Sequence, residues 1–281
     1  MNDDYLKKAK DEIERWEKEG PGWLSRIGSF ILWPAQKAAE LLIPDAVQEA
    51  VGKAIEGFLL GISTFSQSIV GTETIKTDVA KRCSAFGEHP ELWEQLTAAD
   101  EEAQSRWNWH LGYAATEGGA TGVFGLPGLA ADIPALFTVV IRMIQQIAIC
   151  YGYDPTKPEE QEYVMHILRT GSASDVAAKM EALIFLKQVE QILIKVAWKK
   201  MAADLAAKQI GAQSMLAALR QFAKSLGINL TKRKALQMVP IIGALVGASF
   251  NATYTNDIGH AAYFCYRRRW IADREHLEGE I

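Results

Sequence analysis

Three pairs of glycines at GxxxG spacing, each set in largely uncharged sequence, constrain the fold of this chain more than any other feature. The pairs are Gly57 and Gly61, Gly118 and Gly122, and Gly243 and Gly247. Small residues four positions apart share one face of a helix and let two helices approach closely. No segment alternates apolar and polar residues as a strand does. We therefore expect an all-α fold, a single compact multi-helix domain with Gly-rich helical hairpins and an amphipathic N-terminal segment.

The charged residues are unevenly distributed along the chain, which favours one kind of partner. Residues 88–117 carry seven acids against the single base Arg106, whereas residues 187–234 carry ten bases against two acids. Such asymmetry gives a folded protein two faces of opposite potential. The basic face suits an anionic membrane surface or a membrane protein, and we expect no nucleic acid as partner. The alternative is that both runs are solvated helix faces.

Cysteine usage and the N-terminus bear on location. The three cysteines lie far apart and form no CxxC pair, which indicates neither a disulfide framework nor a zinc site, and we expect no bound metal. Residues 1–19 alternate acids and bases and lack the apolar core of a signal peptide. We therefore expect a cytoplasmic protein, with peripheral attachment to the inner face of the plasma membrane as one form of it.

The N-terminal sequence has the pattern of amphipathic helices. Apolar residues recur at helical spacing up to Gly20-Pro21, which predicts an exposed first helix that ends there. A Trp-rich stripe follows in residues 23–34, and it suits either a membrane interface or packing on another helix. The candidate membrane or partner contacts are Trp23, Phe30, Trp33, Lys195, Lys199, Arg267, Arg268 and Arg269. For the three arginines, the alternative is that they lie at the C-terminal end of a helix, where positive charge is favourable.

Two apolar segments approach the length of a membrane span. In the first, Pro127 predicts a break and Asp132 a cap for a helix that runs to Gly152 with Arg142 inside it. This helix falls short of the roughly 20 apolar residues that a span needs. The second, residues 235–256, is uncharged but contains proline, glycine and asparagine. We expect it to form a hairpin that is either buried or partly inserted.

Six polar residues lie beside apolar, Gly-rich sequence, where their burial is costly without a partner. They are Glu117, Asp132 and His260, the catalytic candidates, and Arg142, Asn251 and Asn256, the expected polar network. Converging carboxylates and an imidazole suit metal-assisted hydrolysis. The alternative is a structural network without catalysis. No GxSxG, HExxH or EF-hand motif supports an enzyme, no GxxxxGK[ST] loop indicates a nucleotide, and the sequence identifies no cofactor.

Three blocks of sequence resemble the signature of the EcsC family. The first covers residues 114–134 and contains AATEGGATG, GLPG and DIP, and the second is QQIAICYGYDP at residues 145–155. The third, residues 239–262, contains VPIIGALVGA and IGHAA. Their order and content carry a resemblance that extends over most of the chain, from Trp33 to Arg269.

The family takes its name from a protein encoded beside a bacterial ABC transporter. The resemblance implies a helical bacterial protein linked to membrane transport, and it supplies no catalytic residue. We divide the chain into an N-terminal amphipathic segment (1–32), an EcsC-like helical domain (33–269) and a charged C-terminal tail (270–281). The leading hypothesis is an accessory protein at the membrane, a scaffold or regulator and not an enzyme. The alternatives are a metal-assisted hydrolase and a soluble module that binds a helix.

Overall fold

The protein is all-α throughout the part of the chain that the structure describes, as the sequence predicts. The computed structural model describes residues 2–20, 53, 71–122, 125–173, 177–184, 186–187 and 240–279, and no strand occurs in these ranges. The helices that build the described fold are α1 (Asn2–Lys18), α5 (Thr72–Ser84), α6 (Leu92–Gly122), α7 (Gly125–Cys150), α8 (Pro158–Gly171) and α11 (Pro240–Gly279).

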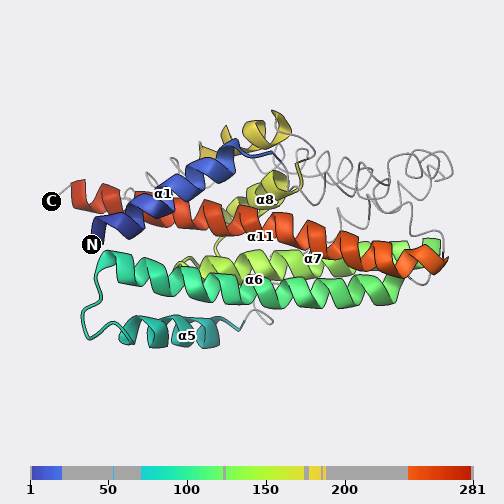
Figure 1. Cartoon of the computed structure of the whole chain (residues 1–281), viewed down its shortest axis with the longest axis horizontal. Coiled ribbons are helices and arrows are strands. Elements are labelled where there is room, and N and C mark those ends of the chain that lie inside the picture. Colours follow the sequence, from blue (N-terminus) through green and yellow to red (C-terminus); the bar gives the residue numbers. More distant parts are fainter. Residues whose placement is uncertain are drawn as a thin grey trace.

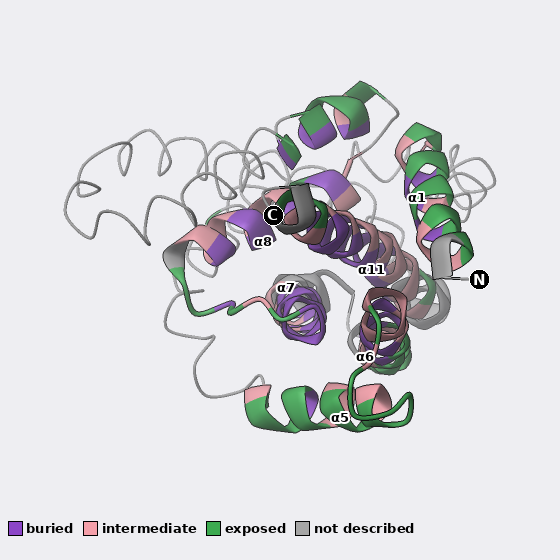
Figure 2. Cartoon of the chain, turned by 90° about the vertical axis from the view of Figure 1, so that its left-hand side faces the viewer, coloured by how far each residue is buried: buried purple, intermediate pink, exposed green. Residues whose placement is uncertain are grey.

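Three long helices, α6, α7 and α11, run side by side and form the centre of the fold (Figure 1). The 40 residues of α11 extend over about 60 Å at the usual helical rise. Helix α8 packs against α11, whereas α5 packs against α6 and α7. Helices α1 and α5 lie on opposite sides of the central three, as both views show (Figures 1 and 2).

The core is made largely by α7 and α11, and α7 is apolar over most of its surface, as expected of a central helix. Phe137, Ile144 and Ile147 of α7 are fully buried, together with Tyr163 of α8 and Tyr266 of α11. In Figure 2 the visible part of α7 is coloured almost entirely as buried, and α11 carries buried and intermediate residues. Burial of side chains of this size stabilises a fold by roughly 1.5 to 3 kcal/mol each, before entropy is counted.

Two described glycines, one in the third sequence block and one at the end of α8, lie in tight contacts between helices. A Cβ atom added at Gly259 would lie 2.2 Å from Nε1 of Trp107, and one at Gly171 would lie 2.8 Å from the Cα of Ile258. Only a residue without a side chain allows α6 and α8 to contact α11 at these points.

The observed helix bounds confirm some of the sequence predictions. The first helix ends at Lys18, just ahead of Gly20-Pro21. The first helix is nevertheless not simply exposed, because Ile13 and Trp16 belong to the core. The ring of Trp16 stacks on Phe264 with 5.2 Å between centroids.

Two predicted boundaries are wrong. Helix α7 begins at Gly125 and continues through Asp132 and Pro134, so Asp132 does not cap it. Pro127 falls in the first turn, where a missing N–H costs nothing, and the predicted break is absent for that reason. The expected hairpin at 235–256 is also absent where the structure describes it, because residues 240–256 are the first part of the continuous helix α11.

Helix α11 also continues through most of the residues assigned to a charged tail and ends at Gly279. Among the described residues, no helix is both long enough and apolar enough to cross a membrane.

Candidate anion-binding pocket

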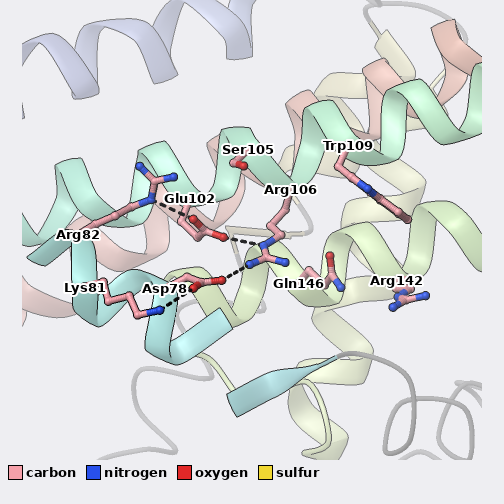
Figure 3. A pocket seen from close by; sticks show the side chains of 9 residues that line it. All are labelled: Asp78, Lys81, Arg82, Glu102, Ser105, Arg106, Trp109, Arg142 and Gln146. Carbon is pink, nitrogen blue, oxygen red and sulfur yellow. Dashed lines mark hydrogen bonds and ion pairs between the residues drawn. The ribbon is translucent and has the colours of Figure 1, made fainter. Parts of the chain in front are cut away.

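A pocket of about 560 Å³ opens between α5, α6 and α7 (Figure 3). Each helix contributes one face to it, at spacings of three or four residues that place side chains above one another. Four of the lining side chains are basic and two are acidic. The lining residues are Asp78, Lys81, Arg82, Glu102, Ser105, Arg106, Trp109, Arg142 and Gln146.

The two acidic side chains of the pocket are already engaged by three of its bases. Glu102 accepts hydrogen bonds from Nε of Arg82 at 2.9 Å and from Nε of Arg106 at 2.6 Å. Asp78 accepts from Nη2 of Arg106 at 2.6 Å and lies 3.8 Å from Nζ of Lys81. This chain of ion pairs crosses from α5 to α6 along one wall (Figure 3).

Arg142 of α7 stands apart from that network. In the part of the chain that the structure describes, its guanidinium makes no hydrogen bond or ion pair, and its Nε is buried without a partner. Figure 3 shows its side chain in the pocket, below Trp109 and beyond the last ion pair. A half-buried cation without a carboxylate loses hydration and gains no protein partner in return.

One helical turn beyond Arg142, Gln146 links the pocket to a buried histidine. The amide oxygen of Gln146 lies 3.0 Å from Nε2 of His110. Burial lowers the pKa of His110 to about 4, and the nearby charges of Arg142 and Arg106 add to this effect. His110 is therefore neutral at pH 7 and donates from Nε2, because an amide oxygen can only accept.

The outer edge of the pocket carries an exposed aromatic pair. Trp109 is 59% exposed and Tyr113, one turn further along α6, is 51% exposed. Their rings stack with centroids 5.6 Å apart and planes 9° from parallel. Exposed apolar side chains that lie together beside a pocket, unlike single scattered ones, are candidates for a contact surface.

These features suit the binding of an oxyanion. An arginine guanidinium matches two oxygens of a phosphate or carboxylate with parallel hydrogen bonds. The excess of basic over acidic side chains favours a negative ligand, and an aromatic wall accommodates its carbon part.

The structure also brings together three of the polar residues singled out in the sequence, at the other end of α7. The side-chain nitrogen of Asn251 donates to Glu117 at 2.9 Å and to Asp132 at 3.0 Å. Asn251 and Asp132 are fully buried. This junction ties α6, α7 and α11 together where α6 ends and α7 begins.

His260 does not join this junction, so the predicted Glu/Asp/His pocket is wrong. It lies nine residues after Asn251 on α11, which corresponds to about 13 Å along the helix axis. Its ring meets the edge of Trp107, with 4.5 Å between centroids, and burial lowers its pKa to about 4. Among the described residues, no group of three or more His, Cys, Asp and Glu side chains is placed to hold a metal. Asn256 is half-buried elsewhere on α11.

The arginines at 267–269, expected at a membrane or partner surface, are instead turned into the fold. Arg267 is 3% exposed and donates to Asp100 at 2.8 Å and to Glu12 at 2.7 Å. Arg269 pairs with Glu160 at 2.6 Å. Their aromatic neighbours cover them, because each lies over a tyrosine ring.

Arg268 forms an ion pair with Glu17 and so links α11 to α1. The carboxylate of Asp100 further accepts from the hydroxyls of Tyr5, at 2.7 Å, and Tyr151, at 2.6 Å. Burial raises the pKa of Asp100, and Arg267 and both tyrosines oppose that rise. The other expected contacts, Trp23, Phe30, Trp33, Lys195 and Lys199, lie outside the described residues.

Sequence reasoning identified Arg142 but missed the rest of the pocket. The signals were present: Arg106 is the single base of an acidic run, and Trp107-Asn108-Trp109-His110 is an aromatic cluster in otherwise charged sequence. Neither pattern indicates by itself that α5, α6 and α7 meet around one cavity.

The helices and the pocket together define an all-α bundle protein with a basic cavity on its flank. The chain belongs to the EcsC protein family, whose profile matches residues 7–271. It is 28% identical over 276 residues to the uncharacterized protein YdbA of Bacillus subtilis (strain 168), which corresponds to 94% of this chain and 92% of that protein. No solved structure matches the chain.

Proposed function

We propose that the protein is a peripheral accessory protein of the cytoplasmic membrane face, which docks on anionic lipid and acts as a scaffold or regulator linked to transport. It performs no reaction of its own. The observation that carries the proposal is the exposed, stacked pair of Trp109 and Tyr113 on the rim of the basic pocket.

The arrangement of charge and aromatic surface supports a membrane interface. Indole and phenol rings have an apolar body and a polar group that stays hydrated, so they settle at the level of lipid headgroups. Basic side chains beside them add attraction for anionic lipid of roughly 1 kcal/mol each. Lys81, 73% exposed at its side chain, and Arg142 supply such charges next to Trp109.

The rival hydrolase hypothesis has lost its geometric support, because His260 and the two carboxylates do not converge. Asn251 occupies the position between Glu117 and Asp132 that a metal or an attacking water would need. This arrangement favours a structural role for the junction.

Cosedimentation of the full chain with vesicles tests the proposal. We expect binding to phosphatidylcholine vesicles that contain phosphatidylglycerol, weaker binding at high salt, and little binding to phosphatidylcholine alone. Replacing both Trp109 and Tyr113 with alanine removes the binding. The matched control is Ile184→Ala, which removes an exposed apolar side chain of another element and leaves the binding intact. Absence of sedimentation with either vesicle at low salt overturns the proposal.

A further inference from the structure

We infer that the pocket between α5, α6 and α7 is a binding site for a phosphomonoester, with the guanidinium of Arg142 holding the phosphoryl oxygens. The inference rests on the proposed function only for the source of the ligand, which is a lipid headgroup at the membrane. The chemistry of the site is argued from the pocket itself.

The first step is the division of charge in the pocket. Glu102 and Asp78 each serve two bases of the neighbouring helices, so neither is available to Arg142. Buried cations in folded proteins are nearly always paired. Arg142 is half-buried in a largely apolar helix, its Nε is buried, and its guanidinium has no such partner among the described residues. A ligand anion supplies the partner that the described chain does not.

The second step is the match in net charge. The lining side chains carry four positive charges, on Lys81, Arg82, Arg106 and Arg142, against two negative ones. Arg82 also pairs with Glu101 outside the lining, so the positive charge that remains without a counter-charge is that of Arg142. A phosphomonoester carries about −1.5 to −2 at pH 7. It therefore balances the charge of Arg142 in full and offers three terminal oxygens as acceptors, whereas a phosphodiester or a carboxylate offers two.

The third step concerns donors and their support. Arg106 uses Nε and Nη2 in ion pairs, so its Nη1 is the group left to face a ligand together with Arg142. The contact between Gln146 and the neutral His110 fixes the amide oxygen of Gln146 away from an anion. An anionic ligand therefore meets donors on the α7 wall and not a competing acceptor.

The fourth step concerns size. A cavity of about 560 Å³ is in the range of small-molecule sites and is much larger than a phosphate ion needs. Trp109 forms the wall beside Arg142 (Figure 3). The phosphoryl group accordingly carries a small organic substituent, such as glycerol, that extends toward the indole and out of the pocket.

Titration calorimetry of the full chain with glycerol 3-phosphate at low ionic strength tests the inference. We expect one site per chain, with affinity reduced at least about tenfold in Arg142→Gln, because a charge-assisted hydrogen bond is lost. Arg142→Lys gives a smaller reduction, since it keeps the charge and loses the two-pronged contact. The matched control is Arg169→Gln. It removes the same charge from α8, where Arg169 forms an ion pair with Glu181 at the surface, and it leaves the affinity unchanged.

The variants remain folded in this experiment, because Arg142 contributes no ion pair to the described fold, and thermal unfolding of each variant verifies this. No binding of glycerol 3-phosphate, or equal affinities in Arg142→Gln and Arg169→Gln, overturns the inference.

A second set of vesicles shows whether the phosphomonoester is a lipid headgroup or a soluble compound. It also tests membrane binding and the phosphomonoester site independently of each other. Phosphatidic acid presents a phosphomonoester, whereas phosphatidylglycerol presents a phosphodiester of similar lipid chemistry. Preference for phosphatidic acid that is lost in Arg142→Gln supports a lipid ligand. Binding of glycerol 3-phosphate through Arg142 without vesicle binding supports a soluble phosphomonoester and overturns the membrane proposal. Vesicle binding that is indifferent to the headgroup and to Arg142 overturns the phosphomonoester site and keeps the membrane proposal.

Discussion

Replacing Asp100 with asparagine is expected to destabilise the protein by about 3 kcal/mol, because it leaves a buried guanidinium without its principal counter-charge. Asp100 is 1% exposed and accepts from Arg267 at 2.8 Å. It also accepts from the hydroxyls of Tyr5 and Tyr151. Asparagine has nearly the same volume, so the change tests charge and hydrogen bonding and not packing.

The magnitude follows from the burial of the pair. Removing one partner of a buried ion pair costs about 3 to 5 kcal/mol. The lower end applies here because Glu12 still accepts from Arg267 at 2.7 Å and neutralises part of its charge. For a chain of this length, about 3 kcal/mol corresponds to a fall in Tm of roughly 6 to 12 °C.

Urea unfolding followed by circular dichroism at neutral pH measures the effect. The matched control is Glu101→Gln, one residue along α6, because Glu101 pairs with Arg82 at the surface and its loss costs less than about 1 kcal/mol. Adding Arg267→Met to Asp100→Asn restores part of the stability by removing the uncompensated charge. A cost for Asp100→Asn no larger than that of Glu101→Gln refutes the reasoning.

Three further predictions concern the helix contacts. Asn251→Asp puts a third carboxylate between two others and lowers the free energy of unfolding by at least about 3 kcal/mol, measured in urea. A loss below about 1 kcal/mol contradicts the prediction. Gly259→Ala drives a methyl group into the indole of Trp107 and costs about 1 to 3 kcal/mol, whereas a neutral result in thermal unfolding shows that the helices separate easily. His110 and His260 have pKa values lowered to about 4, so they are neutral in the folded protein and protonate near pH 6.5 when it unfolds. Their contribution to stability is complete above pH 6.5 and is lost as the pH falls toward 4, by roughly 2 kcal/mol per histidine between pH 7 and pH 5. Replacing both histidines with glutamine therefore makes the urea midpoint less dependent on pH. A midpoint that varies with pH as it does in the unchanged protein refutes the lowered pKa values.

The sequence predicts the helical class well because periodicity is local. The end of α1 and the apolar character of α7 both follow from residues within a few turns of one another. The start of α7 was missed because proline tolerates the first turn of a helix, so Pro127 has two opposite meanings and only the tertiary structure selects one.

The candidate sites depend on contacts between distant residues, which the sequence does not encode locally. The pairing of Asn251 with Glu117 spans 134 positions, and that with Asp132 spans 119. The sequence indicated that such residues needed partners, and it did not say which. The arginines at 267–269 show a different error. The sequence suggested that they contact a membrane or partner surface, whereas each one pairs with an acidic residue of another helix.

A crystal structure of the protein grown with glycerol 3-phosphate tests the central claim most directly. The account predicts the phosphoryl group in the pocket between α5, α6 and α7, with its oxygens within about 3 Å of the Arg142 guanidinium. A phosphoryl group that is bound at another site, with no ligand in contact with the Arg142 guanidinium, contradicts the proposed binding site.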